Sequence, residues 1–416
     1  MLNKKNTIYS NWGDNVINLK DIQNAYDKIQ KSIKKTPLME CPTLDEITNS
    51  TVLLKLENLQ RTGSFKVRGA MNKIMNLTEE EKSHGVIASS AGNHAQGVAL
   101  GAKSIGINAT IVMPETAPLS KVIATKNFGA RVIQHGQYYD EAYNKALEIQ
   151  KKENLVFLHP FNDDYVIAGQ GTIGLEILNE VSDIDIIFVP VGGGGLLSGI
   201  AVAVKSINPN IKVYGVEANG AASMKESVSN KKIIQLKSCH TIADGIAVAK
   251  VGDKTFEIVQ KYVDKIISVS EEEITSAILF LLEKSKVVAE GAGATSLAGL
   301  LSNQVDVKGK KVCCVISGGN IDINNVEKII NKAQILKGRR IEFTVKLSDS
   351  IGQVNNVTEI LKEHKANILY LNQTRYDIDL DVNEQLLNIV IECRDEEHGI
   401  AILTALKDSG FKINRK

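Results

Sequence analysis

Residues 183–204, with the sequence DIDIIFVPVGGGGLLSGIAVAV, decide the fold. Residues 183–191 form a nearly continuous apolar run, which is typical of a strand buried on both faces of a parallel sheet. Four glycines follow at 192–195, and a helical pattern that includes residues 196–204 comes next. A strand, a turn without side chains and a helix predict an α/β fold with an anion-binding site at the start of the helix.

The same alternation continues from residue 51 to about 333 and indicates a mostly parallel sheet. Its other apolar runs lie at 51–57, 85–91, 109–114, 211–218 and 311–318. After 333 the pattern changes to a βαββαβ order, which is typical of a small α+β domain. We therefore expect a first domain at 1–333, a linker at 334–340 and a second domain at 341–416.

Composition narrows the class of function. The 416 residues include 49 Lys+Arg and 48 Asp+Glu, and a net charge of +1 argues against a nucleic-acid surface. The five cysteines form no C-x-x-C pair, so neither a disulfide framework nor a zinc site is indicated. No apolar run reaches the ~18 residues of a membrane span. We expect a cytoplasmic protein that acts on small molecules, with no nucleic-acid or membrane partner.

The stretch 64–70, SFKVRGA, places Lys66 on the first turn of a helix that follows the apolar run 51–57. The positive end of the helix dipole disfavours a lysine cation there by ~0.3–1 kcal/mol. A neutral lysine amine is the nucleophile that forms a Schiff base with an aldehyde. The alternative is an ordinary solvated lysine, which is the commoner occupant of a first helical turn.

Two polar stretches follow strand-like runs, where ligands bind in open α/β sheets. Residues 89–94, SSAGNH, offer hydroxyls, helix-start N–H groups for a carboxylate and the amide of Asn93; an ordinary helix cap is the alternative. In residues 317–320, SGGN, Ser317 supplies a hydroxyl, although a turn serine is the alternative. The glycines at 192–195 match neither G-x-G-x-x-G nor a P-loop. A lysine amine, a phosphate cradle, an amide and a hydroxyl together suit pyridoxal phosphate.

The chain resembles the threonine dehydratases, or threonine ammonia-lyases, of the fold-type II pyridoxal-phosphate family. The resemblance covers about residues 21–333 and rests on motifs that occur in the family order: SFKVRGA, SSAGNHAQG, PVGGGGLLSG, TIADGIAV, VVAEGAGA and ISGGN. It implies two open, mostly parallel-sheet subdomains, the smaller one (about 56–155) inserted in the larger. It also implies pyridoxal 5'-phosphate as cofactor and conversion of L-threonine to 2-oxobutanoate and ammonia, with L-serine as a further substrate to test.

The resemblance assigns roles to individual residues. Lys66 would form the Schiff base and remove the α-proton, and Phe65 would lie beside the cofactor ring. Asn93 would bind the ring hydroxyl and Ser317 the ring nitrogen. The phosphate would be held by Gly192, Gly193, Gly194, Gly195 and Leu196. The substrate carboxylate would be held by Ser90, Ala91, Gly92, Asn93 and His94.

Two positions depart from the related serine racemases. Ala91 stands where those enzymes carry a serine that serves as acid and base, which favours one-sided elimination. Glu217 matches the glutamate of their cation site, but residues 218–223 contain no second carboxylate. We therefore expect no divalent metal, with Glu217 as the one candidate ligand. A serine dehydratase or racemase of the same fold remains the alternative enzyme.

Residues 341–416 resemble an ACT domain, a regulatory module that binds amino acids. Asp349 and Gly352 keep two positions of its Asp-x-Pro-Gly signature, and Ile351 replaces the proline. We expect an amino-acid or nucleotide effector near Asp349 and Gly352, and a homodimer or homotetramer. Assembly without an effector is the alternative, and a biosynthetic or a catabolic role both remain open. An amino-acid sensor with a disabled lyase fold is the non-enzyme alternative.

Overall fold

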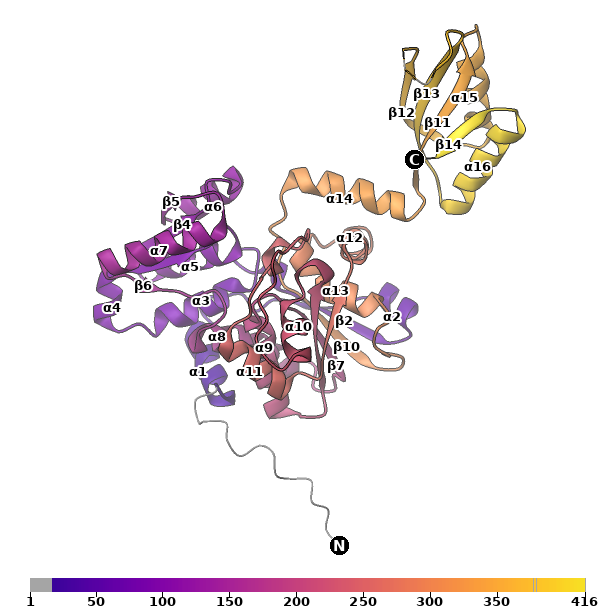
Figure 1. Ribbon diagram of the computed structural model, residues 1–416. Coiled ribbons are helices and arrows are strands. Elements are labelled where there is room, and N and C mark those ends of the chain that lie inside the picture. The colour runs from indigo at the N-terminus through magenta and orange to yellow at the C-terminus, as the bar shows by residue number, and fades with distance from the viewer. Residues whose placement is uncertain (1–16, 377, 379, 416) are drawn as a thin grey trace. The chain divides into compact units, whose positions relative to one another are not determined.

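The computed structural model describes residues 17–415 apart from 377 and 379. The chain divides into two compact units, Met1–Asp322 and Ile323–Lys416 (Figure 1). Among the described residues, no helix has both the length and the apolar character that a membrane crossing needs. The α/β alternation predicted for the first unit and the βαββαβ order predicted for the second are both confirmed.

Among the described residues, the larger sheet of the first unit has six strands, and its edge strand β1 alone runs antiparallel to its neighbour. The central strands are apolar and buried on both faces because helices cover both sides, as expected for a parallel sheet. In spatial order the strands are β1 (Leu38–Glu40), β2 (Thr51–Leu56), β10 (Lys311–Ile316), β7 (Ile186–Pro190), β8 (Lys212–Ala218) and β9 (Lys265–Val269).

The smaller sheet of the first unit has four parallel strands. Helices α5, α6 and α7 lie around its strands (Figure 1). Its strands in spatial order are β5 (Arg131–Gln134), β4 (Ala109–Met113), β3 (Val86–Ser89) and β6 (Val156–Phe157). The helices in this part of the chain are α3 (Lys66–Met75), α4 (Glu79–His84), α5 (Asn93–Ser104), α6 (Leu119–Asn127) and α7 (Tyr139–Glu153).

The remaining helices of the first unit include the closely packed pair α8 and α9. A Cβ at Gly199 would lie 2.4 Å from the carbonyl oxygen of Ile167, so this glycine allows the two helix backbones to approach. These helices are α1 (Leu19–Ile29), α2 (Pro42–Thr48), α8 (Asp164–Glu180), α9 (Gly195–Ile207), α10 (Ser223–Ser229), α11 (Asp253–Tyr262), α12 (Glu271–Phe280) and α13 (Gly291–Leu301). Shorter turns are η1 (Glu57–Leu59), η2 (Asn219–Ala221), η3 (Asp244–Ile246) and the π-helical η4 (Leu281–Ser285).

The second unit contains an antiparallel sheet in the order β12, β13, β11, β14. Phe343, Ile389 and Leu361 are fully buried in its core. Its first helix, α14, includes residue 333, where the sequence predicted the end of the first domain. The domain limits predicted from the sequence remain a prediction. Its elements are α14 (Ile323–Leu336), β11 (Arg340–Ser348), α15 (Gln353–Glu363), β12 (Asn367–Thr374), β13 (Glu384–Glu392), α16 (Glu396–Asp408) and β14 (Lys412–Arg415).

Candidate active site

A cavity of about 670 Å³ lies at the carboxyl ends of strands from both sheets of the first unit. The segments that follow β3, β7 and β10 all line it, together with the start of α3. This is where ligands bind in open α/β folds. The cavity brings together all the cofactor and substrate residues predicted from the sequence: Phe65, Lys66, Ser90, Ala91, Gly92, Asn93, His94, Gly192, Gly193, Gly194, Gly195, Leu196 and Ser317.

Lys66 is the first residue of α3, and its amine faces the cavity. Its Nζ donates a hydrogen bond to the carbonyl oxygen of Pro160 at 3.0 Å. Withdrawal of the amine from water lowers the pKa of Lys66 to about 8, although the charge of Glu290 opposes this shift. Phe65 N–H donates to the carbonyl of Ser317 at 3.1 Å and so joins the lysine segment to the segment after β10. The amine is therefore held in place and is easily deprotonated.

The glycine loop between β7 and α9 is bare because its surroundings leave no room for side chains. A Cβ at Gly193 would lie 2.3 Å from ring carbons of Phe161, and one at Gly192 would lie 2.9 Å from the Cα of Ile246. Gly194 has φ of 92°, a left-handed conformation that favours glycine. The loop leads directly into α9, whose first N–H groups and positive dipole end suit a phosphate.

The segment after β3 places polar groups at the start of α5. The backbone N–H of Gly92 donates to Ser90 Oγ at 3.1 Å, and α5 begins at Asn93. His94 is buried, with Nε2 3.0 Å from the carbonyl oxygen of Leu158. Burial, with a smaller contribution from the charge of Lys66, lowers the pKa of His94 to about 3, so its ring is neutral at physiological pH. His94 therefore anchors the segment, while the N–H groups of the first turn of α5, which begins at Asn93, are suited to a carboxylate.

Two parts of the site were not predicted. Glu290 lines the cavity and accepts a hydrogen bond from Asn93 Nδ2 at 2.7 Å. His159 Nδ1 accepts the N–H of Asn162 at 2.9 Å and fixes a turn that supplies the carbonyl bonded to Lys66 and the ring packed on Gly193. The sequence signals were a glutamate inside the VVAEGAGA motif and the stretch His-Pro-Phe-Asn at 159–162, one residue after β6.

Glu217 and the effector residues lie elsewhere. Glu217 is fully buried in β8, and its carboxylate accepts the N–H groups of Met224 and Lys225 at 2.8 Å each. Burial raises the pKa of Glu217 to about 8 despite these two hydrogen bonds. Asp349 and Gly352 belong to the second unit, in the loop that leads into α15.

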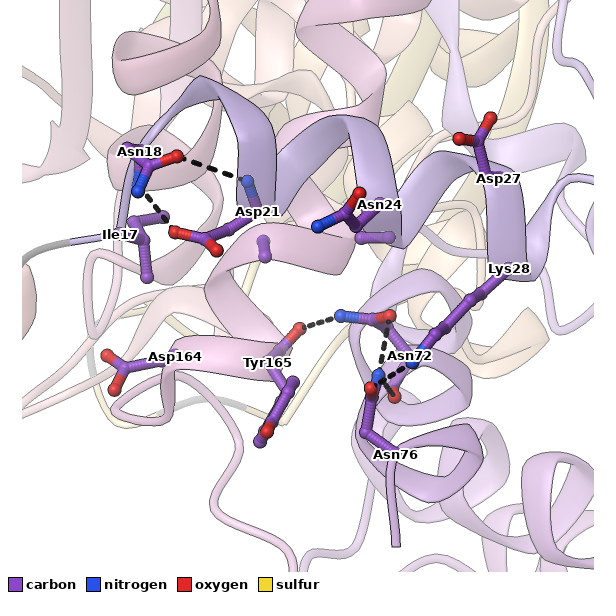
Figure 2. A pocket seen from close by; sticks show the side chains of 12 residues that line it. Ile17, Asn18, Asp21, Asn24, Asp27, Lys28, Asn72, Asn76, Asp164 and Tyr165 are labelled. Carbon is purple, nitrogen blue, oxygen red and sulfur yellow. Dashed lines mark hydrogen bonds between the residues drawn. The ribbon is translucent and has the colours of Figure 1, made fainter.

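A second cavity of about 570 Å³ lies between α1, α3 and α8 (Figure 2). Its amides bond to each other and to the backbone: Asn72 Nδ2 donates to the carbonyl of Tyr165 at 2.7 Å, and Asn76 Nδ2 donates to Asn72 Oδ1 at 3.1 Å. Lys28 in turn donates to Asn76 Oδ1. Because these polar side chains are already paired, the cavity that contains Lys66 is the better candidate for chemistry.

The sequence pattern of the pyridoxal-phosphate dependent enzymes matches residues 29–318, and the chain belongs to this family. It is 50% identical over 398 residues to the L-threonine ammonia-lyase of Thermotoga maritima, which covers 96% of this chain and 99% of that one. Threonine deaminase isoform 2 from Solanum lycopersicum aligns with a TM-score of 0.73 and 39% identity over 76% of this chain and 87% of that chain. Maize serine racemase aligns with a TM-score of 0.73 and 37% identity over 77% and 99%. The predicted family and cofactor are confirmed.

The residues of the cavity fit pyridoxal phosphate. Lys66 presents an amine of lowered pKa, and the bare glycine loop presents helix-start N–H groups. Ser89 lines this cavity, and its buried Oγ has no hydrogen-bond partner among the described residues. A bound polar group can satisfy it. When bound, the cofactor supplies an aldehyde for an amine and a ring that withdraws electrons.

Gly193→Ala is expected to weaken binding of pyridoxal phosphate. The added methyl would stand 2.3 Å from the ring of Phe161, and overpacking of this kind costs about 1–3 kcal/mol. That range corresponds to roughly 5- to 150-fold in the dissociation constant. Gly92→Ala is the matched control for cofactor affinity, because nothing lies within 4 Å of a Cβ there. Equal cofactor affinities of the two variants, measured by equilibrium titration, would contradict the assignment of the cradle.

Proposed function

We propose that the protein is an L-threonine ammonia-lyase, which converts L-threonine to 2-oxobutanoate and ammonia. The observation that carries this proposal is the placement of a low-pKa lysine amine and a bare glycine loop at a helix N-terminus in one cavity. The name of the relative that is 50% identical over 96% of the chain supports the same activity. The reaction is a β-elimination, in which an α-proton and a hydroxyl group leave the substrate.

Each segment of the cavity has a task in this reaction. Lys66 accepts the α-proton on Nζ, because its lowered pKa keeps a fraction of the amine neutral near pH 8. The N–H groups at the start of α9 hold the phosphate, and those at the start of α5 hold the substrate carboxylate. Asn93, at the start of α5, contributes an amide, and Ser317, directly after the end of β10, contributes a hydroxyl. Phe65 lies beside the amine, with its ring centroid 5.2 Å from Lys66 Nζ.

A serine dehydratase or racemase is the second candidate, and the likeness to maize serine racemase motivates it. Ala91 lines the cavity and has no group that can donate or accept a proton, which favours elimination over racemisation. The test is incubation of the purified protein with L-threonine or L-serine. We expect equal amounts of 2-oxobutanoate and ammonia from threonine. Formation of D-serine by chiral analysis, with little 2-oxobutanoate, would favour the racemase instead.

For the second unit we propose regulation by an amino-acid or nucleotide effector that binds at the loop before α15, in a homo-oligomer. The N–H groups at the start of this 11-residue helix suit a carboxylate or phosphate. Gly352 has φ of 90°, so any side chain there would be strained. Asp349 is the better residue to change, because its ion pair with Arg375, at 3.4 Å, is partly exposed to solvent.

Asp349→Ala is expected to reduce the response of threonine turnover to the effector, while turnover without effector stays unchanged. Allosteric coupling of ~1–3 kcal/mol corresponds to roughly 5- to 150-fold in affinity. The measurement is a threonine titration of the full-length protein with isoleucine, valine or a nucleotide present. Asp408→Ala, at an exposed position of α16, is the matched control. Wild-type response in Asp349→Ala would rule out this loop as the effector site.

A further inference from the structure

Glu290 is a buried carboxyl group at the cavity wall, outside the set of residues assigned above. It is the N-cap of α13, and its backbone N–H donates to the carbonyl of Gly318 at 3.1 Å. A Cβ at Gly318 would lie 2.3 Å from Glu290 Oε1, so the glycine makes room for the carboxylate. The side chain is 5% exposed and faces the same cavity as Lys66.

A chain of hydrogen-bonded amides determines which atom of the Asn93 side chain faces Glu290. Asn320 Nδ2 donates to the carbonyl of Thr62 at 2.7 Å, and a carbonyl oxygen can only accept, so the amide orientation of Asn320 is determined. The same Nδ2 donates to Asn93 Oδ1 at 2.7 Å, which turns Asn93 Nδ2 toward Glu290 Oε1. Glu290 takes one N–H of this amide, and the other N–H is left for a ligand in the cavity.

Several charged groups face Glu290 from different elements. Burial and the negative charge of Asp244 on η3 raise the pKa of Glu290 to about 7, and the hydrogen bond from Asn93 and the charge of Lys121 on α6 oppose the shift. Lys121 and Asp244 are themselves paired at 2.8 Å. From α3, Lys66 responds to Glu290, whose charge raises the pKa of the amine against the effect of burial. An ionised Glu290 therefore favours a positive charge on Lys66 Nζ.

We propose that Glu290 is a positioning residue for the reaction: it orients the amide of Asn93 and acts as counter-ion to the ammonium that forms on Lys66. The inference rests on the proposed function, in which the α-C–H bond breaks and an N–H bond forms at Lys66 Nζ. The electron pair of the broken bond stays on the substrate. A cation then forms on an amine whose charge burial disfavours, and the carboxylate of Glu290, which lines the same cavity, lowers the cost of that charge.

Glu290→Gln tests the charge, because it keeps the size of the side chain and an acceptor for Asn93. In the wild-type holoenzyme, kcat for threonine should rise in two steps: one near pH 7, where Glu290 ionises, and one near pH 8, where the amine of Lys66 loses its proton. In Glu290→Gln we expect the step near pH 7 to be lost, the step that belongs to Lys66 to remain, and kcat above pH 7 to fall about tenfold, the change that one pKa unit represents. Glu290→Asp keeps the charge and should restore the lost step. Glu257→Gln, at an exposed position of α11, is the matched control and should keep the wild-type profile.

The visible absorption of the bound cofactor gives a readout that does not depend on turnover. The pH at which this band changes should be lower in Glu290→Gln, because the carboxylate that favours a positive charge on the Lys66 nitrogen is gone. If Glu290→Gln and Glu290→Asp only reduce activity, with the pH profile and the band unchanged, Glu290 is a structural residue and the proposal is wrong. Wild-type protein inactive on threonine would contradict the proposed function alone, since the band titration would still decide the role of Glu290.

Discussion

Lys66→Ala is expected to abolish threonine deamination and the visible absorption band of bound pyridoxal phosphate. Removing a positioned acid or base costs about 10²–10⁴-fold in rate, and Lys66 is in addition the amine expected to bond the cofactor. The fold should survive, because alanine has the highest helix propensity and position 66 begins α3. The substitution also removes an amine that is withdrawn from water. Rate, absorption spectrum and circular dichroism of the purified variant measure the three effects.

Lys152→Ala, on the exposed face of α7, is the matched control for Lys66→Ala. It removes the same side chain from the same subdomain and should leave both turnover and the absorption band at wild-type levels. Production of 2-oxobutanoate by Lys66→Ala at a rate comparable to this control would show that Lys66 is not the reacting amine. Loss of the circular dichroism signal in Lys66→Ala would instead show that the fold depends on this lysine.

The fold was predictable because its signals are local. Strands buried on both faces have nearly continuous apolar sequences, and the predicted run 109–114 is β4 (Ala109–Met113) in the structure. A helix start could also be predicted: α5 begins at Asn93, inside the stretch 89–94 that was expected to offer helix-start N–H groups. The short strand β6 was missed, because two residues are too few for a periodic pattern to be recognised.

The site could be predicted only where a single segment is recognisable from its own sequence. Two segments are of this kind: Lys66 after a strand, and four glycines before a helix. Glu290 is not, because its role depends on Asn93, which lies 197 residues away in the sequence. The turn that holds Lys66 was missed for the same reason, since Pro160 is 94 residues from the lysine. Contacts of this kind are set by tertiary packing, and no period or propensity in a single segment predicts them.

Arg68 illustrates the same limit, since it lies inside the SFKVRGA motif but its partners are distant. It is fully buried and its Nη2 and Nη1 groups bond Glu57 Oε1 and Glu176 Oε1 at 2.7 Å each. Lys55 Nζ completes the cluster at 2.7 Å from Glu176 Oε2. Two cations and two carboxylates, each at most 1% exposed, tie β2, η1, α3 and α8 together. Removing any one of the four side chains alone leaves a buried charge without its partner.

Arg68→Met is therefore expected to destabilise the protein by about 3–5 kcal/mol, because it leaves a buried carboxylate without its partner. The measurement is the free energy of unfolding of the cofactor-loaded protein in urea. Arg131→Met is the matched control: its ion pair with Glu153 has the same 2.7 Å distance, but the side chains are 51% and 38% exposed. Exposed pairs contribute about 0–1 kcal/mol. Equal losses in the two variants would mean that burial of the cluster has no energetic consequence.

The pH dependence of stability provides an independent test of how Arg68 acts on Glu57. Burial alone would raise the pKa of Glu57, but the charge and hydrogen bonds of Arg68 outweigh it and hold the pKa below the ordinary 4.5. Glu57 thus stabilises the wild type at pH above 4.5, and this contribution is lost as pH falls through its folded-state pKa. Without Arg68, burial should dominate and raise the pKa of Glu57 in the folded state. Arg68→Met should then lose stability as pH rises above about 4.5, the opposite trend to wild type, and adding Glu57→Gln should remove that pH dependence while recovering part of the lost stability.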